Sequence, residues 1–247
     1  MSTSFNRIIS LVPSLTELLI DLGLKNKLVG RTRFCVHPED DVDDIPIMGG
    51  TKNPVLDNIF QADPDLVIAN REENRKADIE QLRRKCEVHC TDIATIEDAL
   101  ITIHELGRLL GVADAARSLT RRISNVLEQR PGETRLRTAY LIWRDPWMTV
   151  GSDTYIRDVM DHWGLLNIFD DQERYPTIEL RQIRQRYPDL VLLSSEPFPF
   201  RQNHVEEVQE QLPNTRVLTV NGEWFSWYGS RMLSSFEQLN TWRKAIA

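Results

Sequence analysis

Four aromatic rings fall within five consecutive positions near the end of the sequence, at Trp224, Phe225, Trp227 and Tyr228. A glycine stands on each side of this segment, which favours a loop over a regular element. Buried rings usually sit inside regular elements, where they are packed from all sides. The segment therefore allows two interpretations: a cluster that seals the end of a hydrophobic core, or a ring-lined wall of a ligand cleft.

Two more tryptophans, Trp143 and Trp147, lie at and just after the end of the segment TAYLIW, which predicts a strand. The aromatic segment likewise follows a predicted strand, RVLTV at 216–220. In an open parallel sheet, ligands bind outside the carboxyl ends of the strands. The rings of both segments are therefore expected to face one opening, and this favours the cleft interpretation.

Cysteines and histidines raise the question of a metal site. In CEVHC, an extended chain points Cys86 and Cys90 to one side and His89 to the other, so the thiols are expected to pack in a core. Cys35 and His37 share one side of their segment, but two ligands do not complete a metal site. The five histidines are scattered along the chain, which argues against binding of free zinc or manganese ions. We expect no metal ligands.

Motifs of catalysis are absent from the sequence. There is no GxxxxGK, HExxH, GxSxG or strand-linked GxGxxG, and no nucleophile with an orienting base can be named. The stretch MGGTKNP at 48–54 could hold an anion through its backbone N–H groups, but its two glycines fit a turn better. The sequence therefore predicts no catalytic residue and a protein that is not an enzyme.

Strand patterns alternate with helix patterns along the whole chain. RIISLVPS predicts a first strand, and the helix after it is expected to begin with a capping box of Ser14 and Glu17. DPDLVIAN, CEVHCTD, TAYLIW, PDLVLLSS and RVLTV predict further strands, and Ser152 and Asp153 mark the start of a helix from about Thr154. This alternation predicts an α/β fold with mostly parallel sheets.

A longer helix interrupts the alternation at 112–129. It carries a sustained apolar stripe formed by Val112, Ala116, Leu119, Ile123, Val126 and Leu127, and it ends before Pro131. The sequence therefore predicts an N-terminal α/β lobe at 1–111, a linking backbone helix at 112–130 and a C-terminal α/β lobe at 131–247.

Composition restricts the partners. The 247 residues include 30 basic and 37 acidic side chains, interspersed, for a net charge of −7, which argues against nucleic acid or an anionic membrane as the main partner. No apolar run approaches the roughly 20 residues of a membrane span. The first residues lack the cleavage site of a signal peptide. We expect no membrane insertion.

The two halves share a short repeat. ADPDLVIANREEN at 62–74 and RYPDLVLLSSEPF at 186–198 both contain Pro-Asp-Leu-Val at the start of a predicted strand. Each half then offers an acidic residue soon after the strand, Glu72 or Glu73 in the first and Glu196 in the second. The two lobes are expected to be built alike, although PDLV is also a common way to enter a buried strand.

With RIISLVPSLTELLIDLG, LVGRTRFCVHP, ADPDLVIAN and GSDTYIRDVMDHWGLLNIF, the chain resembles the substrate-binding proteins of ABC importers for cobalamin and iron–siderophore complexes, and most nearly their cobalamin-binding members. The resemblance covers nearly the whole chain. It implies two Rossmann-like lobes joined by a single long helix, with a bulky metal chelate held in a cleft between them. The ligand-facing residues implied are Pro13, Ser14, Phe34, His37, Gly50, Thr51, Trp147, Tyr175, Trp224, Trp227 and Tyr228.

The function implied by the resemblance is delivery of the chelate, a cobalamin or an iron complex with no covalent cofactor, to an ABC permease. Glu72 or Glu73 and Glu196 would dock on that permease, and the protein would act as a monomer. Asn70 stands where such relatives can place a tryptophan, which leaves a siderophore or heme ligand open. Family members are periplasmic or extracytoplasmic, but the absence of a signal peptide leaves a cytoplasmic chelate-handling protein or enzyme of the same fold as an alternative.

Overall fold

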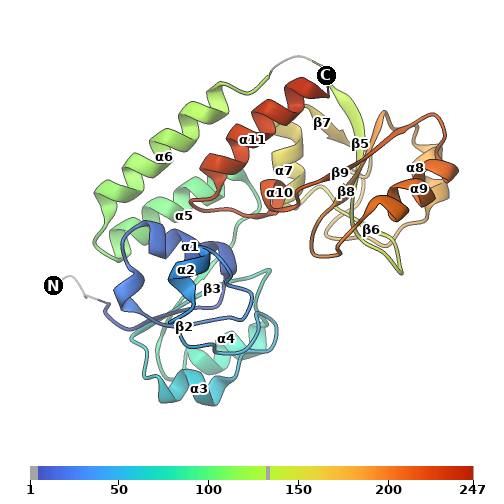
Figure 1. Ribbon diagram of the computed structural model, residues 1–247. Coiled ribbons are helices and arrows are strands. Elements are labelled where there is room, and N and C mark those ends of the chain that lie inside the picture. The colour runs from blue at the N-terminus through green and yellow to red at the C-terminus, as the bar shows by residue number, and fades with distance from the viewer. Residues whose placement is uncertain (1–4, 132–133, 247) are drawn as a thin grey trace. The chain divides into compact units, whose positions relative to one another are not determined.

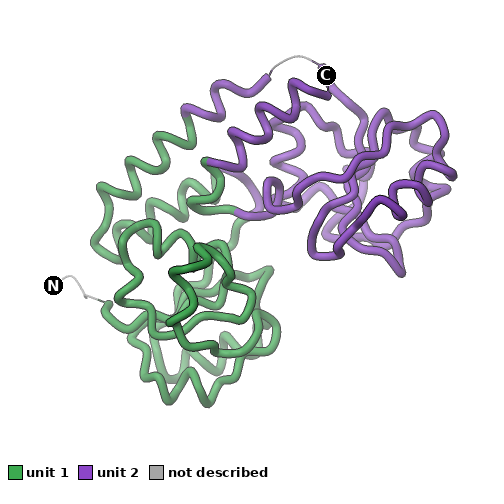
Figure 2. The backbone as a smooth tube through the Cα atoms, in the orientation of Figure 1, with its two compact units in different colours: residues 1–93, 97–124, 228–233 green, residues 94–96, 125–227, 234–247 purple. Residues whose placement is uncertain are grey.

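The computed structural model describes residues 5–131 and 134–246, which form two compact units (Figure 2). Of the described residues, the first unit contains 5–93, 97–124 and 228–233, and the second contains 94–96, 125–131, 134–227 and 234–246. The chain therefore returns to the first unit for six residues that begin with Tyr228, the last residue of the aromatic segment. The sequence placed the limits of the linking helix between residues 111 and 112 and between residues 130 and 131. These domain boundaries stay a prediction.

The first unit is an α/β structure. Its strands are β1 (Ile8–Ser10), β2 (Leu28–Arg31), β3 (Leu66–Asn70) and β4 (Glu87–Thr91), and its helical segments are α1 (Pro13–Asp21), η1 (Lys25–Lys27), α2 (Glu39–Val42), α3 (Leu56–Gln61), α4 (Lys76–Leu82) and most of α5 (Ile96–Leu109). The strands form one parallel sheet in the order β2-β1-β3-β4.

Both faces of the first sheet are covered. Val67 and Ala69 of β3 pack on one face with Ile59 of α3 and Ile79 of α4. The alternate residues of β3, Leu66 and Ile68, are also fully buried. A strand buried on both faces is the arrangement that parallel sheets require, because the crossover helices lie on either side.

The second unit repeats this plan with a larger sheet. Its strands are β5 (Leu136–Trp143), β6 (Met148–Thr149), β7 (Leu165–Asn167), β8 (Leu190–Ser194) and β9 (Arg216–Val220), and its helices are α7 (Tyr155–His162), α8 (Leu180–Gln185), α9 (Gln202–Gln211), α10 (Glu223–Ser226) and most of α11 (Met232–Ala245). β5 pairs in parallel with β7 and β8, and β8 pairs in parallel with β9. β6 pairs antiparallel with β5. The α/β class with parallel sheets is confirmed, with one antiparallel hairpin added.

The helix expected between the lobes is α6 (Ala113–Glu128), and the units share it (Figures 1 and 2). Ala116, Ile123 and Val126 of the predicted apolar stripe are buried. Residues up to Ser124 belong to the first unit and those from Asn125 to the second. Among the described residues, no helix is both long enough and apolar enough to cross a membrane.

The internal repeat extends to individual hydrogen bonds. In the first unit the Arg7 side chain donates to the carbonyls of Ala62 and Asp63, and its backbone N–H donates to the Asp65 carboxylate (3.0 Å). In the second unit Arg137 makes the same three bonds, to the carbonyls of Arg186 and Tyr187 and to the Asp189 carboxylate (2.8 Å).

The turn before each repeated strand is also the same. Asp63 and Tyr187 both have left-handed backbone, with φ of 45° and 49°. The shared Pro-Asp-Leu-Val therefore marks one construction used twice, and β3 and β8 occupy equivalent places beside β1 and β5. The expectation that the two lobes are built alike is confirmed.

Helices α1 and α7 both begin within one residue of the expected position, but the expected capping residues are wrong. Ser14 and Glu17 form no capping box, because α1 already begins at Pro13 with Val12 as its N-cap. Proline is favoured at the first helical position, since its missing N–H would have no partner there. Ser152 and Asp153 do not cap α7, because the Thr154 hydroxyl accepts the hydrogen bond from the Arg157 N–H.

Candidate ligand site

Aromatic rings gather at the carboxyl edge of the second sheet. Trp143 ends β5 and is 40 % exposed, and its ring packs edge-on against Phe198, which follows β8 (5.7 Å between ring centroids). Trp147, in the hairpin between β5 and β6, stacks on Phe200 with an interplanar angle of 4°. Phe198 and Phe200 touch each other, so four rings form one continuous cluster.

An ion pair lies beside the cluster. The Arg144 guanidinium lies 5.6 Å from the Trp147 ring and donates two hydrogen bonds to the Glu207 carboxylate on α9. His204, also on α9, packs edge-on against Phe198 and Phe200. Phe198 and Phe200 did not enter the expected site, although the sequence places them after a strand end just as it places the tryptophans.

The aromatic segment after β9 begins in a short helix, α10, which carries Trp224 and Phe225 where a loop was expected, and Trp227 and Tyr228 follow the helix. Phe225 is fully buried and packs on Tyr140 and Trp242, so this ring belongs to the core. Trp224 and Trp227 are half-buried. Tyr228 is 6 % exposed and belongs to the first unit. The four rings therefore divide between buried and accessible positions. The core interpretation holds for Phe225, and the cleft interpretation stays a prediction for Trp224 and Trp227.

Trp227 is tied to the loop that follows β8. Its indole N–H donates to the Glu196 carboxylate (3.1 Å), which also accepts a hydrogen bond from the Ser226 hydroxyl (2.6 Å). Parallel pairing of β5, β8 and β9 puts their carboxyl ends at one edge. The Trp147, Phe198 and Trp227 segments therefore line the same edge of one sheet.

Tyr175 lies at the far side of this edge, next to β6. The segment that carries it is held by hydrogen bonds from Thr149 N–H to the Pro176 carbonyl (3.1 Å) and from Gly151 N–H to the Arg174 carbonyl (2.7 Å). Its ring is half-buried and faces the Arg174 guanidinium at 5.9 Å.

In the first unit, the expected ligand-facing residues also lie at the carboxyl edge of the sheet. Pro13 and Ser14 open α1 after β1, and Phe34 and His37 follow β2. Ser14 is only 6 % exposed, whereas Phe34 is 53 % exposed.

The turn at Gly50 and Thr51 lies beside Phe34. Gly50 and Asn53 exchange backbone hydrogen bonds, and Gly49 has a φ of +97°, so MGGTKNP is the turn that was expected. A Cβ on Gly50 would lie 3.2 Å from the Phe34 ring, which shows how closely the turn approaches that ring.

Asn70 is fully buried and organises the loop that carries Glu72 and Glu73. Its side-chain oxygen accepts hydrogen bonds from both glutamate N–H groups (2.8 and 3.2 Å). Asn74 closes the loop by accepting from the Asn70 N–H and donating to the carbonyls of Leu11 and Thr51. Asn70 therefore holds backbone in place and presents no side chain at the surface, which the sequence did not reveal.

Glu17 and Arg231 form an ion pair inside the first unit. The guanidinium donates to both carboxylate oxygens at 2.8 and 2.7 Å, and Glu17 is 7 % exposed. Burial is the main cause that raises the pKa of Glu17, and the hydrogen bond and charge of Arg231 oppose it. The pair fixes residues 228–233, which begin with the last ring of the aromatic segment, to α1.

The cysteines lie apart from any site for a metal ion. Cys35 is fully buried, with its sulfur 3.1 Å from the Thr16 hydroxyl, and burial raises the pKa of its thiol. Cys86 and Cys90 are partly buried and pack against the core of the first unit, as expected for thiols on one side of a strand. Among residues 5–131 and 134–246, no group of three or more His, Cys, Asp and Glu side chains could hold a metal ion.

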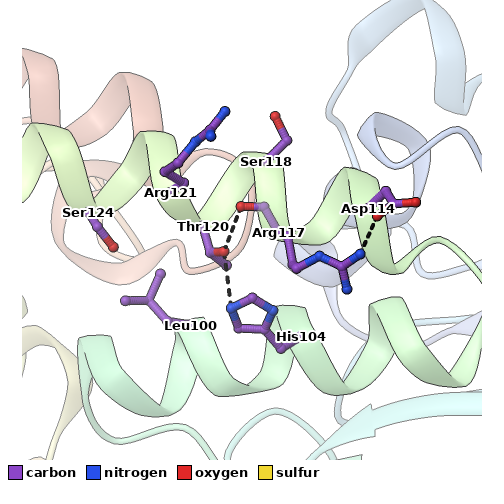
Figure 3. A pocket seen from close by; sticks show the side chains of 8 residues that line it. All are labelled: Leu100, His104, Asp114, Arg117, Ser118, Thr120, Arg121 and Ser124. Carbon is purple, nitrogen blue, oxygen red and sulfur yellow. Dashed lines mark hydrogen bonds and ion pairs between the residues drawn. The ribbon is translucent and has the colours of Figure 1, made fainter.

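A separate groove of about 570 Å³ runs between α5 and α6 in the first unit (Figure 3). Its lining combines Leu100 with seven polar or charged side chains: His104, Asp114, Arg117, Ser118, Thr120, Arg121 and Ser124. His104 and Thr120 share a hydrogen bond (3.1 Å), and Arg117 pairs with Asp114. No ring besides the His104 imidazole lines this groove, so it lacks the apolar stacking surface that a large planar chelate needs.

The comparisons with known proteins agree with this architecture. The residue profile of the periplasmic binding protein family matches residues 8–219. A vitamin B12-binding protein of Vibrio campbellii is 25 % identical over 244 residues, covering 94 % of this chain and 87 % of that protein.

Solved structures share the fold. The periplasmic vitamin B12-binding protein of Vibrio cholerae superposes with a TM-score of 0.83 at 23 % identity, covering 98 % of this chain and 97 % of the other. A periplasmic heme-binding protein of Roseiflexus sp. RS-1 superposes with a TM-score of 0.82 at 17 % identity, covering 98 % and 99 %. With its two α/β units, its shared helix and a family profile that spans most of its length, the chain belongs to the periplasmic binding protein family.

Proposed function

We propose that this protein is the substrate-binding component of an ABC importer, and that it binds a bulky metal chelate of the corrinoid type at the aromatic edge of its second unit. The observation that carries this proposal is the set of accessible rings there: Trp143, Trp147, Trp224 and Trp227. A corrin ring has a broad, largely apolar face, which indole rings can cover and desolvate. The vitamin B12-binding relatives support this ligand class.

We expect further contacts with the ligand from residues at the carboxyl edge of the first sheet and from two tyrosines: Pro13, Ser14, Phe34, His37, Gly50, Thr51, Tyr175 and Tyr228. Polar groups at these positions would form hydrogen bonds with the carboxamides around a corrin. Heme is the main rival ligand, because heme-binding proteins share the fold, and an iron–siderophore complex is the next. The relatives are binding proteins, which supports transport without a catalytic step.

A titration tests the ligand. Cyanocobalamin, hemin and a ferric siderophore are added separately to the purified protein while tryptophan fluorescence is followed. We expect quenching that saturates with cyanocobalamin, because the absorbing macrocycle would lie against several indoles. Quenching by hemin or the siderophore alone would replace the corrinoid, and no quenching by any of the three would refute the proposal.

Trp224→Ala should weaken binding by about 1–3 kcal/mol if its ring covers the ligand, the range found when well-packed contact residues are truncated. The matched control is Tyr187→Ala, which removes an 82 % exposed ring before the start of β8, at the opposite end of that strand. The control should keep the wild-type affinity. An unchanged affinity in Trp224→Ala would assign this ring to structure alone.

We further propose that the protein works outside the cytoplasm as a monomer, and that glutamates on equivalent loops dock on the two subunits of the permease. The duplicated construction supports this, because Glu72 and Glu196 follow β3 and β8 at matching distances. Two separated carboxylates that pair with arginines would fix the orientation of the protein on the permease, whereas one alone would not.

Replacing Glu72 and Glu73 together with alanine should raise the protein concentration needed to stimulate the permease ATPase by at least about tenfold, since losing a docked charge pair costs several kcal/mol. The single variants would show which glutamate docks. The double variant should still bind the chelate as the wild type does. Wild-type stimulation by the double variant would contradict docking by this loop.

A further inference from the structure

The carboxylate of Glu196 lies against the accessible part of the aromatic segment. Its Oε1 atom accepts hydrogen bonds from Ser226 Oγ (2.6 Å) and Trp227 Nε1 (3.1 Å), and all three residues belong to the second unit. Hydrogen bonds to an ionised acceptor are about twice as strong as neutral ones. Glu196 therefore restrains the orientation of a half-buried indole that the ligand would contact.

The backbone around Glu196 is built for this close approach. A Cβ on Gly222 would lie 2.5 Å from Glu196 Cγ and 2.4 Å from Ser194 Oγ, so any other residue at this position would displace these side chains. The Gly222 N–H donates to Ser195 Oγ (3.0 Å), which joins the start of α10 to the end of β8. The backbone segments that carry Glu196 and Trp227 are therefore held against each other, and this keeps the two side chains within hydrogen-bonding distance.

We propose that Glu196 is a positioning residue for Trp227, so that the carboxylate expected to dock on the permease also sets the contact with the ligand. This inference rests on the proposed function and adds a means of regulation to it. Withdrawal of the carboxylate from Trp227 weakens ligand contact in the second unit.

Docking on the permease would withdraw the Glu196 carboxylate from Trp227, because an arginine of the permease competes for the same oxygen. An arginine pairs best with a carboxylate through both oxygens. Oε1 of Glu196 already accepts two hydrogen bonds, as many as its two lone pairs provide for. A guanidinium that binds in the bidentate manner takes Oε1 from Trp227 and Ser226. Docking would thereby release the indole and lower the affinity for the chelate at the moment of delivery.

The first arm of the test needs no ligand. In the ¹⁵N-labelled protein the six tryptophans give six indole N–H signals, and the Trp227 signal is assigned by its loss in Trp227→Phe. Glu196→Ala should shift the Trp227 signal and speed its exchange with water about tenfold or more, since a hydrogen bond to a charged acceptor is lost. Glu72→Ala, which removes the carboxylate at the equivalent position of the first unit, is the matched control and should leave the signal in place.

The second arm measures affinity for cyanocobalamin and for hemin. Glu196→Ala should weaken binding about tenfold in the wild-type background and have little effect when Trp227→Phe has already removed the indole donor. Glu196→Gln keeps a hydrogen-bond acceptor without its charge. Its affinity for the ligand should lie between those of the wild type and Glu196→Ala.

An unmoved Trp227 signal in Glu196→Ala would overturn the inference, as would an affinity loss of the same size in both backgrounds. Failure of the wild-type protein to bind either probe would refute the proposed ligand instead. In that case the shift and exchange of the Trp227 signal still decide whether Glu196 positions the ring.

Discussion

Phe225→Ala is expected to lower the free energy of unfolding by about 3–5 kcal/mol, the usual cost of removing a buried phenylalanine ring. Phe225 is fully buried, and its ring packs on Tyr140 (5.1 Å) and edge-on against Trp242 (6.3 Å). The surrounding side chains come from a strand and a helix and cannot close the space without moving backbone. Urea denaturation of the purified variant would measure the loss.

The matched control is Trp224→Ala, next to it in sequence. Trp224 is half-buried, so its removal should cost distinctly less stability than that of Phe225 while affecting ligand affinity more directly. A stability loss of the same size for both variants would contradict the division of α10 into a structural ring and accessible rings.

This division shows how far a sequence can predict such a site. Strand ends, helix patterns and the Pro-Asp-Leu-Val repeat predicted the fold class and the long helix, because they depend on local periodicity and on the shared construction around Arg7 and Arg137. The sequence also placed aromatic residues after β5 and β9. It could not show which rings are buried, because Phe225 faces Tyr140 on a different strand and that contact is set by tertiary packing.

Polar contacts over long sequence distances were the hardest to predict. The sequence shows Asn70 only as a position where relatives can place a tryptophan, yet it is fully buried and accepts hydrogen bonds from the Glu72 and Glu73 N–H groups. Glu17 fits a capping box by its spacing from Ser14, but its carboxylate pairs with Arg231, more than two hundred residues away. Spacing in sequence contains no information about a partner brought in by the fold.

Arg231→Met should destabilise the protein by about 3–5 kcal/mol at pH 8, because it leaves the Glu17 carboxylate buried without its counter-ion. Methionine fills a similar volume, so lost packing contributes little. Denaturant titrations of the wild type and the variant at pH 8 would measure the difference. The double variant Glu17→Gln/Arg231→Met removes both charges and should recover most of the stability, since the cost lies in the unpaired ion and not in the absence of the bond.

The loss in Arg231→Met should also depend on pH, with a sign that identifies its cause. In the folded wild type the pKa of Glu17 is raised above its ordinary 4.5, mainly by burial, and Arg231 opposes the rise. Without Arg231 the folded pKa rises further. A carboxyl group with a raised folded pKa binds more protons in the folded than in the unfolded state. Its contribution to stability is therefore fully present below pH 4.5 and is lost as the pH rises through the folded pKa.

The stability difference between the wild type and Arg231→Met should therefore shrink as the pH is lowered from 8 through the folded pKa of Glu17, because the protonated carboxyl group needs no counter-ion. The double variant has no carboxyl group at position 17 and should not show this convergence. A loss that stays equal from pH 8 down to the lowest pH at which both proteins remain folded would mean that Arg231 stabilises the first unit by packing alone. Convergence would show that the segment directly after the aromatic rings is held to α1 by charge.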